Sequence, residues 1–282
     1  MSRAPLLVIG RSSFLAREFL ARNADLELRV IGHQQAGEPA AYEDIACVVN
    51  FTFAPELHDL PYRDELDIDA RAAQQAARRG IHYVMMSSRR VYQEDAQWNA
   101  AEDAPVSGLD QYGRNKLRIE LALHALMAER LTVLRPGNVV GYEAIPGRKR
   151  FAAYLQNQLL ETGRIRLTVG PQTRRDLVPV EFFCRVLREV MLRRAPGIFN
   201  VGAGRATAAG DAARWLIEGY GAAELAVESD RRVDEFLLDS AKLARVLGLA
   251  CAEGEVERAL RDAGRRLAES RSAAAPRTGR PA

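Results

Sequence analysis

The sequence predicts an α/β protein in which a parallel β-sheet carries helices on both of its faces. Short apolar segments, which indicate buried strands, alternate with longer segments whose apolar residues recur at helical spacing. Strands are predicted at 5–9, 27–31, 46–52, 82–88, 131–135 and 197–201. Helices are predicted at 14–22, 65–79, 110–129, 150–161, 180–193, 207–219 and 254–268. Such alternation gives a doubly wound sheet whose ligands bind at the carboxyl ends of the strands.

The composition is that of a folded protein with a sizeable core. The chain has 282 residues, a length that suits one large domain or one and a half. Of these residues 48% are hydrophobic, which is enough to form the core. The net charge of +3 is mild and the basic residues are scattered, so binding to nucleic acid is not expected. No segment approaches the length of a membrane span, and the N-terminus lacks a signal peptide. The polar residues from 269 to 282 predict a disordered tail.

Cysteines and histidines give no sign of a metal site. The three cysteines lie far apart and are expected to be reduced thiols in a cytoplasmic protein; they are Cys47, Cys184 and Cys251. The four histidines are dispersed along the chain, and we expect them to be ordinary surface or core residues; they are His33, His58, His82 and His124.

The first predicted strand runs through a turn of small residues, from Gly10 to Ala16, into a helix. This is the context of a dinucleotide-binding fingerprint, because the turn directs backbone N–H groups and the positive end of the helix at a pyrophosphate. Only Gly10 of the three expected glycines is present, while Ser13 and Ala16 occupy the other two positions. The turn by itself also fits an ordinary connection between a strand and a helix.

Tyr112 and Lys116 are four residues apart and therefore share one face of a predicted helix. A lysine ammonium beside a phenol stabilises the phenolate. A phenol tuned in this way can exchange a proton with a sugar or alcohol oxygen while a hydride moves. The pair alone is a weak signal, because any exposed helix can carry it by chance.

Four further segments accompany this pair. The strand at 82–88 ends in Ser87 and Ser88, and Val91-Tyr92 follows. Further along lie the run Leu-Arg-Pro-Gly-Asn-Val-Val-Gly at 134–141 and the segments at 174–180 and 197–202. In order and spacing, these segments resemble the extended short-chain dehydrogenases/reductases. More narrowly, they resemble the branch of NAD(P)-dependent nucleotide-sugar epimerases, dehydratases and reductases, over roughly residues 4 to 265.

The resemblance implies a Rossmann-type sheet with a smaller, discontinuous C-terminal lobe that binds substrate. The NAD(P)-binding domain would comprise 1–141 and about 176–205, and the substrate-binding lobe 142–175 and 206–268. About a dozen residues, 33–44, separate the second strand from the third, so we expect the connection usual in the family to be shrunken. Helices 65–79 and 110–129 would pair in a homodimer.

The resemblance also assigns roles to residues. Tyr112 would be the proton donor or acceptor, Lys116 its electrostatic partner, and Ser88 the hydrogen-bonding partner of the substrate oxygen. The residues expected to contact the cofactor are Gly10, Arg11, Ser12, Ser13, Phe14, Leu15, His33, Asn50, Phe51, Thr52, Tyr112 and Lys116. The residues expected to contact the substrate are Ser88, Asn138, Arg175 and Arg232, the last of which equally fits a solvated surface. Asp69 occupies a position where many relatives have Asn.

At two places the sequence departs from the pattern of the family, and these departures reduce the number of activities and cofactors to be expected. Arg89 and Arg90 stand where the dehydratases carry an Asp-Glu pair, and arginine cannot serve as that acid or base. We therefore disfavour a 4,6-dehydratase and expect both arginines to face solvent. No Asp or Glu lies near Gly32 to bind a ribose 2′-hydroxyl, and Arg11 with His33 suits a 2′-phosphate. The cofactor is therefore predicted to be NADP rather than NAD.

These expectations favour a reductase that transfers hydride from NADPH to a keto group of a nucleotide-activated deoxysugar, with Tyr112 as proton donor. The alternative is an NAD-dependent nucleotide-sugar epimerase that uses the same residues. A second alternative, a non-catalytic dinucleotide sensor or scaffold, is favoured by the degenerate glycine turn. It is disfavoured by the intact Ser88, Tyr112 and Lys116.

Overall fold

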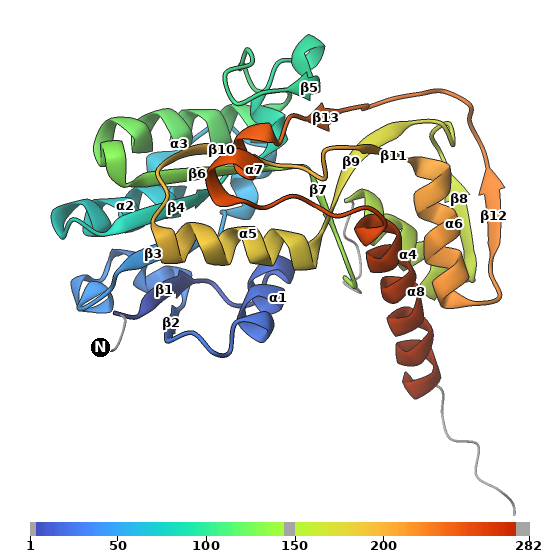
Figure 1. Ribbon diagram of the computed structural model, residues 1–282, viewed down its shortest axis with the longest axis horizontal. Helices are drawn as coiled ribbons and strands as arrows, with labels where there is room; N and C mark the ends of the chain where they lie inside the picture. Colours follow the sequence, from blue (N-terminus) through green and yellow to red (C-terminus); the bar gives the residue numbers. More distant parts are fainter. Residues whose placement is uncertain (1–3, 144–149, 275–282) are drawn as a thin grey trace, which may run out of the picture.

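The computed structural model describes residues 4–143 and 150–274 and is built around one parallel sheet (Figure 1). Its six strands lie in the order β10-β6-β4-β3-β1-β2, and every neighbouring pair is parallel. They are β1 (Leu6–Ile9), β2 (Leu28–Ile31), β3 (Cys47–Asn50), β4 (His82–Met86), β6 (Leu131–Pro136) and β10 (Gly197–Val201). The predicted fold class and all six predicted strands are thus confirmed.

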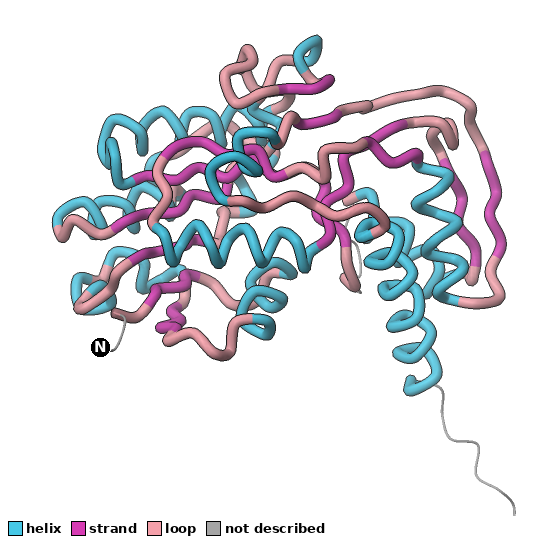
Figure 2. Tube along the Cα trace, viewed as in Figure 1, coloured by secondary structure: helices cyan, strands magenta, loops and turns pink. Residues whose placement is uncertain are grey.

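Helices cover both faces of this sheet (Figures 1 and 2). They are α1 (Phe14–Arg22), α2 (Ile68–Arg78), α3 (Gln111–Met127) and α5 (Val180–Arg193). Successive side chains of β1 alternate between two separate cores: Val8 packs with α1 and α5, whereas Leu7 packs with α2 and α3. Because the central strands are buried on both faces, their sequences are continuous apolar runs rather than alternating ones.

The connection between β2 and β3 is reduced, as expected from its length. Two short 3-10 turns, η1 (His33–Gly37) and η2 (Pro39–Tyr42), take the place of a full helix. The buried Tyr42 closes the connection by donating its hydroxyl to the Ala36 carbonyl at 2.6 Å. Its ring joins the core beneath α2 and thereby covers this part of the sheet.

A smaller group of elements extends from one side of the sheet (Figure 1). Its strands are β7 (Asn138–Val140), β8 (Arg164–Leu167), β9 (Arg174–Pro179), β11 (Ala206–Ala208) and β12 (Glu224–Val227). Its helices are α4 (Phe151–Thr162), α6 (Ala209–Tyr220) and α8 (Glu255–Ala274). A third core, with Leu159 of α4, Leu216 of α6 and Leu267 of α8, holds the group together.

Several elements and one boundary were not predicted. The strands of the smaller group, β7, β8, β9, β11 and β12, are absent from the predicted strands. So are β5 (Trp98–Ala100), which pairs with β13 (Leu237–Leu238), and the helix α7 (Ala241–Leu247). Helix α8 continues to Ala274, so the tail predicted to be disordered from 269 is helical up to that residue. Buried Leu267 anchors the last turns of this helix, and residues 275–282 lie outside the described residues.

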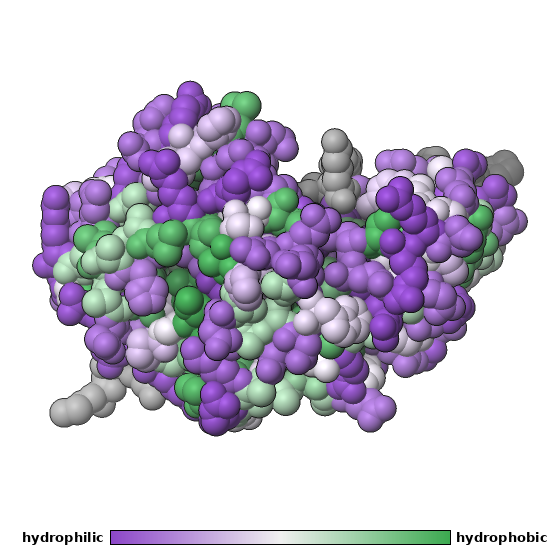
Figure 3. Space-filling model, turned by 90° about the horizontal axis from the view of Figure 1, so that it is seen from above, coloured by the Kyte–Doolittle hydropathy of each residue, from purple (hydrophilic) through white to green (hydrophobic). Residues whose placement is uncertain are grey.

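On the face shown in Figure 3, hydrophilic side chains cover much of the surface, and apolar side chains gather mainly over the larger part of the molecule. Within the described ranges, no helix combines the length and the apolar composition needed to cross a membrane.

Candidate active site

The carboxyl edge of the sheet gathers the segments that the sequence singled out. Ile9, Asn50 and Met85 lie in register on the neighbouring strands β1, β3 and β4. The turn after β1, the segment after β3 and the serines after β4 therefore emerge side by side.

The turn after β1 has the geometry of a pyrophosphate cradle. Gly10 adopts φ +84°, and a Cβ atom placed on it would lie 2.4 Å from Cγ2 of Thr52. Only glycine fits there, because both the backbone angle and the space exclude a side chain. Ser13 caps α1 by accepting the backbone N–H of Ala16 at 3.2 Å, so the positive end of α1 faces the turn.

The side chains of the other residues of this turn differ in how much of their surface is exposed. Arg11 and Ser12 are exposed, whereas the Phe14 side chain is buried in the core and anchors the start of α1. Leu15 is half-buried against the same core. His33 is exposed directly after β2, in the first position of η1. The turn therefore fits the dinucleotide that the sequence predicts, through its backbone and the end of α1.

Asn50, at the end of β3, shapes the segment that follows it. Its side-chain oxygen accepts the backbone N–H of Thr52 at 2.9 Å and the Thr52 hydroxyl at 2.5 Å. Its amide nitrogen donates to Asp69 at 2.9 Å. The Phe51 ring turns into the core against Phe19, with centroids 5.9 Å apart. These contacts fix the backbone that passes beside Gly10, and the predicted contact of Asn50 and Phe51 with the cofactor stays a prediction.

Helix α3 starts against the turn that follows β4. Asp110 caps the helix by accepting the Gly113 N–H at 2.8 Å, and it also forms an ion pair with Arg90. A Cβ atom on Gly113 would lie 2.0 Å from the Arg90 carbonyl oxygen, so the helix approaches this turn at backbone contact. This close approach places Tyr112 and Lys116 next to the segment that carries Ser88.

Lys116 is buried, with an exposed fraction of 3%. Its ammonium donates to the Met86 carbonyl at 2.7 Å and lies 3.9 Å from Oδ2 of Asp69. The other oxygen of Asp69 accepts the Tyr83 hydroxyl at 2.8 Å. Burial raises the pKa of the Asp69 carboxyl, while the Lys116 ammonium opposes that rise. The carboxylate is thus a buried counter-charge for the lysine.

Tyr112 lies against two aromatic residues that the sequence did not single out for the site. Its ring stacks on His58, with centroids 4.9 Å apart and planes 6° from parallel. Phe53 meets the edge of this pair, with centroids 5.3 Å from Tyr112 and 5.1 Å from His58. No local pattern marks either residue, because their place depends on how the irregular segment after β3 folds over α3.

Ser88 opens a 3-10 turn, η5 (Arg89–Val91), and its hydroxyl accepts the Arg90 N–H at 3.2 Å. The expectation that Arg89 faces solvent is wrong, since only 3% of the residue is exposed. Its guanidinium lies 3.7 Å from the centroid of the Phe236 ring and 2.5 Å from Asp234. Gln97, just before β5, also accepts a hydrogen bond from it at 2.8 Å. Asp234 and Phe236 lie just before β13, so the partners of Arg89 come from distant parts of the sequence.

Apart from Ser88, the candidate substrate residues lie on or beside the smaller group of elements. Asn138 is half-buried at the start of β7. Arg175 on β9 is largely buried and donates to the backbone oxygens of Val233 and Asp234, each at 3.3 Å. Arg232 is exposed and forms an ion pair with the nearby Glu235 at 2.8 Å. Arg175 therefore holds the segment that carries Arg232.

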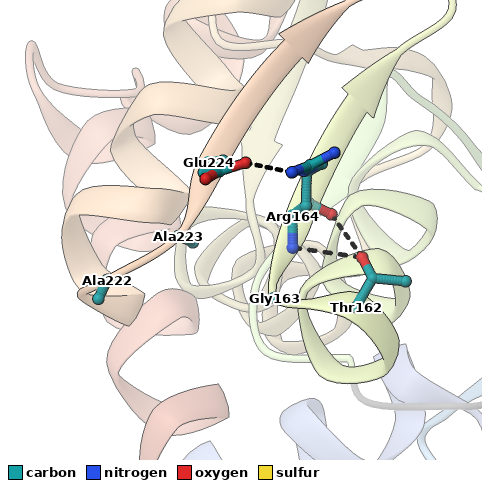
Figure 4. A pocket seen from close by; sticks show the side chains of 6 residues that line it. All are labelled: Thr162, Gly163, Arg164, Ala222, Ala223 and Glu224. Carbon is teal, nitrogen blue, oxygen red and sulfur yellow. Dashed lines mark hydrogen bonds and ion pairs between the residues drawn. The ribbon is translucent and has the colours of Figure 1, made fainter.

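Two surface hollows lie away from these residues. One is lined by Thr162, Gly163, Arg164, Ala222, Ala223 and Glu224, beside β8 and β12 (Figure 4). An ion pair between Arg164 and Glu224, 2.5 Å long, crosses it. Another hollow lies by η2 and the end of α2. Neither contains a candidate site residue.

Comparison with known proteins places this site within a family. The model of the NAD-dependent epimerase/dehydratase family matches residues 57–202. No curated protein matches the sequence. TunA, an NAD-dependent NDP-hexosamine 5,6-dehydratase of tunicamycin biosynthesis, has a solved structure that is 20% identical to this chain, with a TM-score of 0.79. The match covers 95% of this chain and 98% of TunA.

Two further solved structures share the fold. The UDP-glucose 4-epimerase of Thermotoga maritima, solved with UDP-glucose, is 18% identical with a TM-score of 0.79, covering 94% of this chain and 99% of its own. RMD from Pseudomonas aeruginosa, complexed with NADPH, is 19% identical with a TM-score of 0.72 and the same coverage. Because the family model spans more than half of the 282 residues, including Tyr112 and Lys116, the chain belongs to the NAD-dependent epimerase/dehydratase family of enzymes.

Proposed function

We propose that this protein reduces a keto group of a nucleotide-activated deoxysugar, with NADPH as cofactor. The observation that carries the proposal is the placement of the Tyr112–Lys116 pair beside the strand end that bears Ser88. When bound, NADPH supplies the hydride for the keto carbon. Tyr112 gives a proton to the keto oxygen, and Ser88 donates a hydrogen bond to that oxygen. The Lys116 charge stabilises the phenolate that remains.

The turn after β1 would hold the pyrophosphate of the cofactor. Its backbone, from Gly10 to Leu15, meets the positive end of α1, and the Thr52 segment closes the other side. The choice of NADP over NAD is supported by the end of β2, where His33 follows Ile31-Gly32 and no carboxylate stands to bind a 2′-hydroxyl. Exposed Arg11 and His33 suit a 2′-phosphate.

The smaller lobe, 142–175 and 206–268, would bind the nucleotide sugar. Asn138 and Arg175 lie where the lobe joins the sheet, and Arg232 is presented on the segment that Arg175 holds. A guanidinium suits a diphosphate because it bonds oxygen atoms in a bidentate fashion. We also propose a homodimer through α2 and α3, supported by the exposed Leu121 and Leu126 on α3.

The environment of Arg89 supports reduction over 4,6-dehydration. Its guanidinium is engaged by Gln97, Asp234 and the Phe236 ring. The position after Ser88 therefore carries a buried cation, which cannot exchange the proton that elimination of water requires.

A nucleotide-sugar epimerase is the second candidate, favoured by the family that the chain belongs to. It would use the same three residues, removing hydride from the sugar and returning it to the opposite face of the ring.

The cofactor separates these two functions. A reductase must release its oxidised cofactor in each cycle, whereas an epimerase retains NAD throughout. We expect denatured protein to release no stoichiometric dinucleotide, and we expect untreated protein to bind NADPH at least about tenfold more tightly than NADH, a preference worth about 1.4 kcal/mol. Identification of released nucleotide and titrations monitored by calorimetry would measure both. Stoichiometric, tightly held NAD would favour the epimerase instead.

A further inference from the structure

The Lys116 ammonium is enclosed by three neighbours. It donates to the Met86 carbonyl at 2.7 Å, faces the Asp69 carboxylate at 3.9 Å and lies 4.2 Å from the centroid of the Phe53 ring. An ammonium has three N–H groups, and these three neighbours surround it. Only 3% of the residue is exposed in this arrangement.

Phe53 is the most exposed of the three neighbours and the only one that lies outside a helix or strand. The Met86 carbonyl belongs to a buried strand of the sheet, and Asp69 is fixed by Asn50 and Tyr83. Phe53, in contrast, is half-buried and lies in an irregular segment after β3. Its ring is held from the outside by edge contacts with Tyr112 and His58.

We propose that Phe53 is a gate residue of the cofactor site, whose ring covers Lys116 and must turn away before the ammonium can donate to the ribose. The inference rests on the proposed function, because that function gives Lys116 its contact with the cofactor. When the ring turns away, Lys116 keeps its bond to Met86 and its counter-charge on Asp69, so the cation remains in place. The closed state lowers the apparent cofactor affinity by the fraction of molecules that are open.

The stacked His58 is the outer support of this gate. It contacts both the Phe53 edge and the Tyr112 face, so the three rings form one group over α3. Movement of Phe53 separates it from this group and leaves the His58–Tyr112 stack intact. The phenol therefore keeps its position while the lysine becomes accessible.

The affinity of the full-length protein for NADPH tests the gate. The variant Phe53→Ala removes the ring, so we expect its dissociation constant for NADPH to fall by about fivefold or more. Phe53→Leu retains an apolar side chain without an aromatic face. Its dissociation constant for NADPH should lie between those of the native protein and Phe53→Ala. Trp98→Ala is the matched control, because it also removes a ring beneath a cation, Arg174 at 4.6 Å, but lies on β5. Its affinity should equal that of the native protein.

Amine labelling gives a second readout that needs neither substrate nor turnover. The chain has only three lysines, Lys116, Lys149 and Lys242, so each can be followed by mass spectrometry. Lys116 should be protected in the native protein, labelled faster in Phe53→Ala, and protected again by NADPH. Lys242 serves as the internal reference.

The outcomes separate the gate from the function. An unchanged or weaker NADPH affinity in a folded Phe53→Ala protein, with unchanged labelling of Lys116, would overturn the gate, yet binding of NADPH by the native protein would leave the proposed function standing. If neither protein binds NADPH or NADH, both the gate and the proposed function are wrong. If Phe53→Ala does not fold, the same comparison with Phe53→Leu decides.

Discussion

At the scale of single residues, buried charges fix how the site is built. The Glu120 carboxylate accepts Arg135 at 2.6 Å and the Ser87 hydroxyl, and all three residues are buried. The Lys116 ammonium lies near the Asp69 carboxylate, and the Arg89 guanidinium forms an ion pair with Asp234. A buried charge is costly unless it is paired, so each of these partners is required where it stands. The strand end that bears Ser87 and the middle of α3 are joined by the Ser87–Glu120 hydrogen bond.

The Arg89–Asp234 pair gives a measurable consequence. Asp234→Asn keeps the size of the side chain and tolerates the φ of +54° at this position, but it leaves the Arg89 guanidinium buried without its carboxylate. Because the Asp234 side chain is 34% exposed, we expect the free energy of unfolding to fall by about 2 kcal/mol in urea denaturation. Glu235→Gln is the control, because Glu235 pairs with the exposed Arg232; its effect should stay within about 1 kcal/mol. Equal effects of the two substitutions would refute the importance of the buried pair.

At the scale of elements, a buried histidine joins the strands in the middle of the sheet. His82 on β4 contacts the Thr132 hydroxyl on β6 at 2.7 Å, and that hydroxyl donates to the Ala195 carbonyl at 2.5 Å. The Thr132 oxygen must therefore accept from His82, so the neutral imidazole carries its proton on Nε2. Burial lowers the pKa of His82 to about 4.

This pKa predicts how stability depends on pH. The unfolded chain takes up a proton on this residue below about pH 6.5, whereas the folded protein resists until about pH 4. Stability therefore falls as the pH drops through this window, by up to about 3 kcal/mol from His82. His82→Gln removes the titrating group, and we expect a shallower decline of the free energy of unfolding between pH 6.5 and 4.

Comparison of the two proteins at each pH isolates this contribution. Burial raises the pKa of Asp176 to about 6, which has the opposite effect in the same window, but Asp176 is present in both proteins and cancels. Parallel declines in the native protein and His82→Gln would contradict the assignment.

At the scale of the whole molecule, the sheet was predictable because burial on both faces makes its strands continuous apolar runs. The strands β5 and β13 were not predictable from the sequence. Each consists of a few residues that show no periodicity of their own, and the two strands lie more than a hundred positions apart in the chain. The burial of Arg89 was missed for the same reason, since its cover includes Asp234 and Phe236.

The candidate site was predictable to a similar degree. Tyr112 and Lys116 were found because helical spacing brings them together, and Gly10 because the turn after the first strand requires it. Phe53 and His58 were not found, because only the folded segment after β3 brings them to α3. The role that the sequence gave to Arg175 stays a prediction, while the structure shows this residue holding the segment before Arg232.

The central claim is that Tyr112 is the proton donor of an NADPH-dependent keto reduction. The most direct test is the rate of NADPH oxidation with 4-keto nucleotide sugars, measured for the native protein and for Tyr112→Phe. We predict that the native protein turns over at least one such sugar, and that the variant loses about a hundredfold or more in kcat while binding NADPH equally well. Equal turnover by the two proteins would contradict the account.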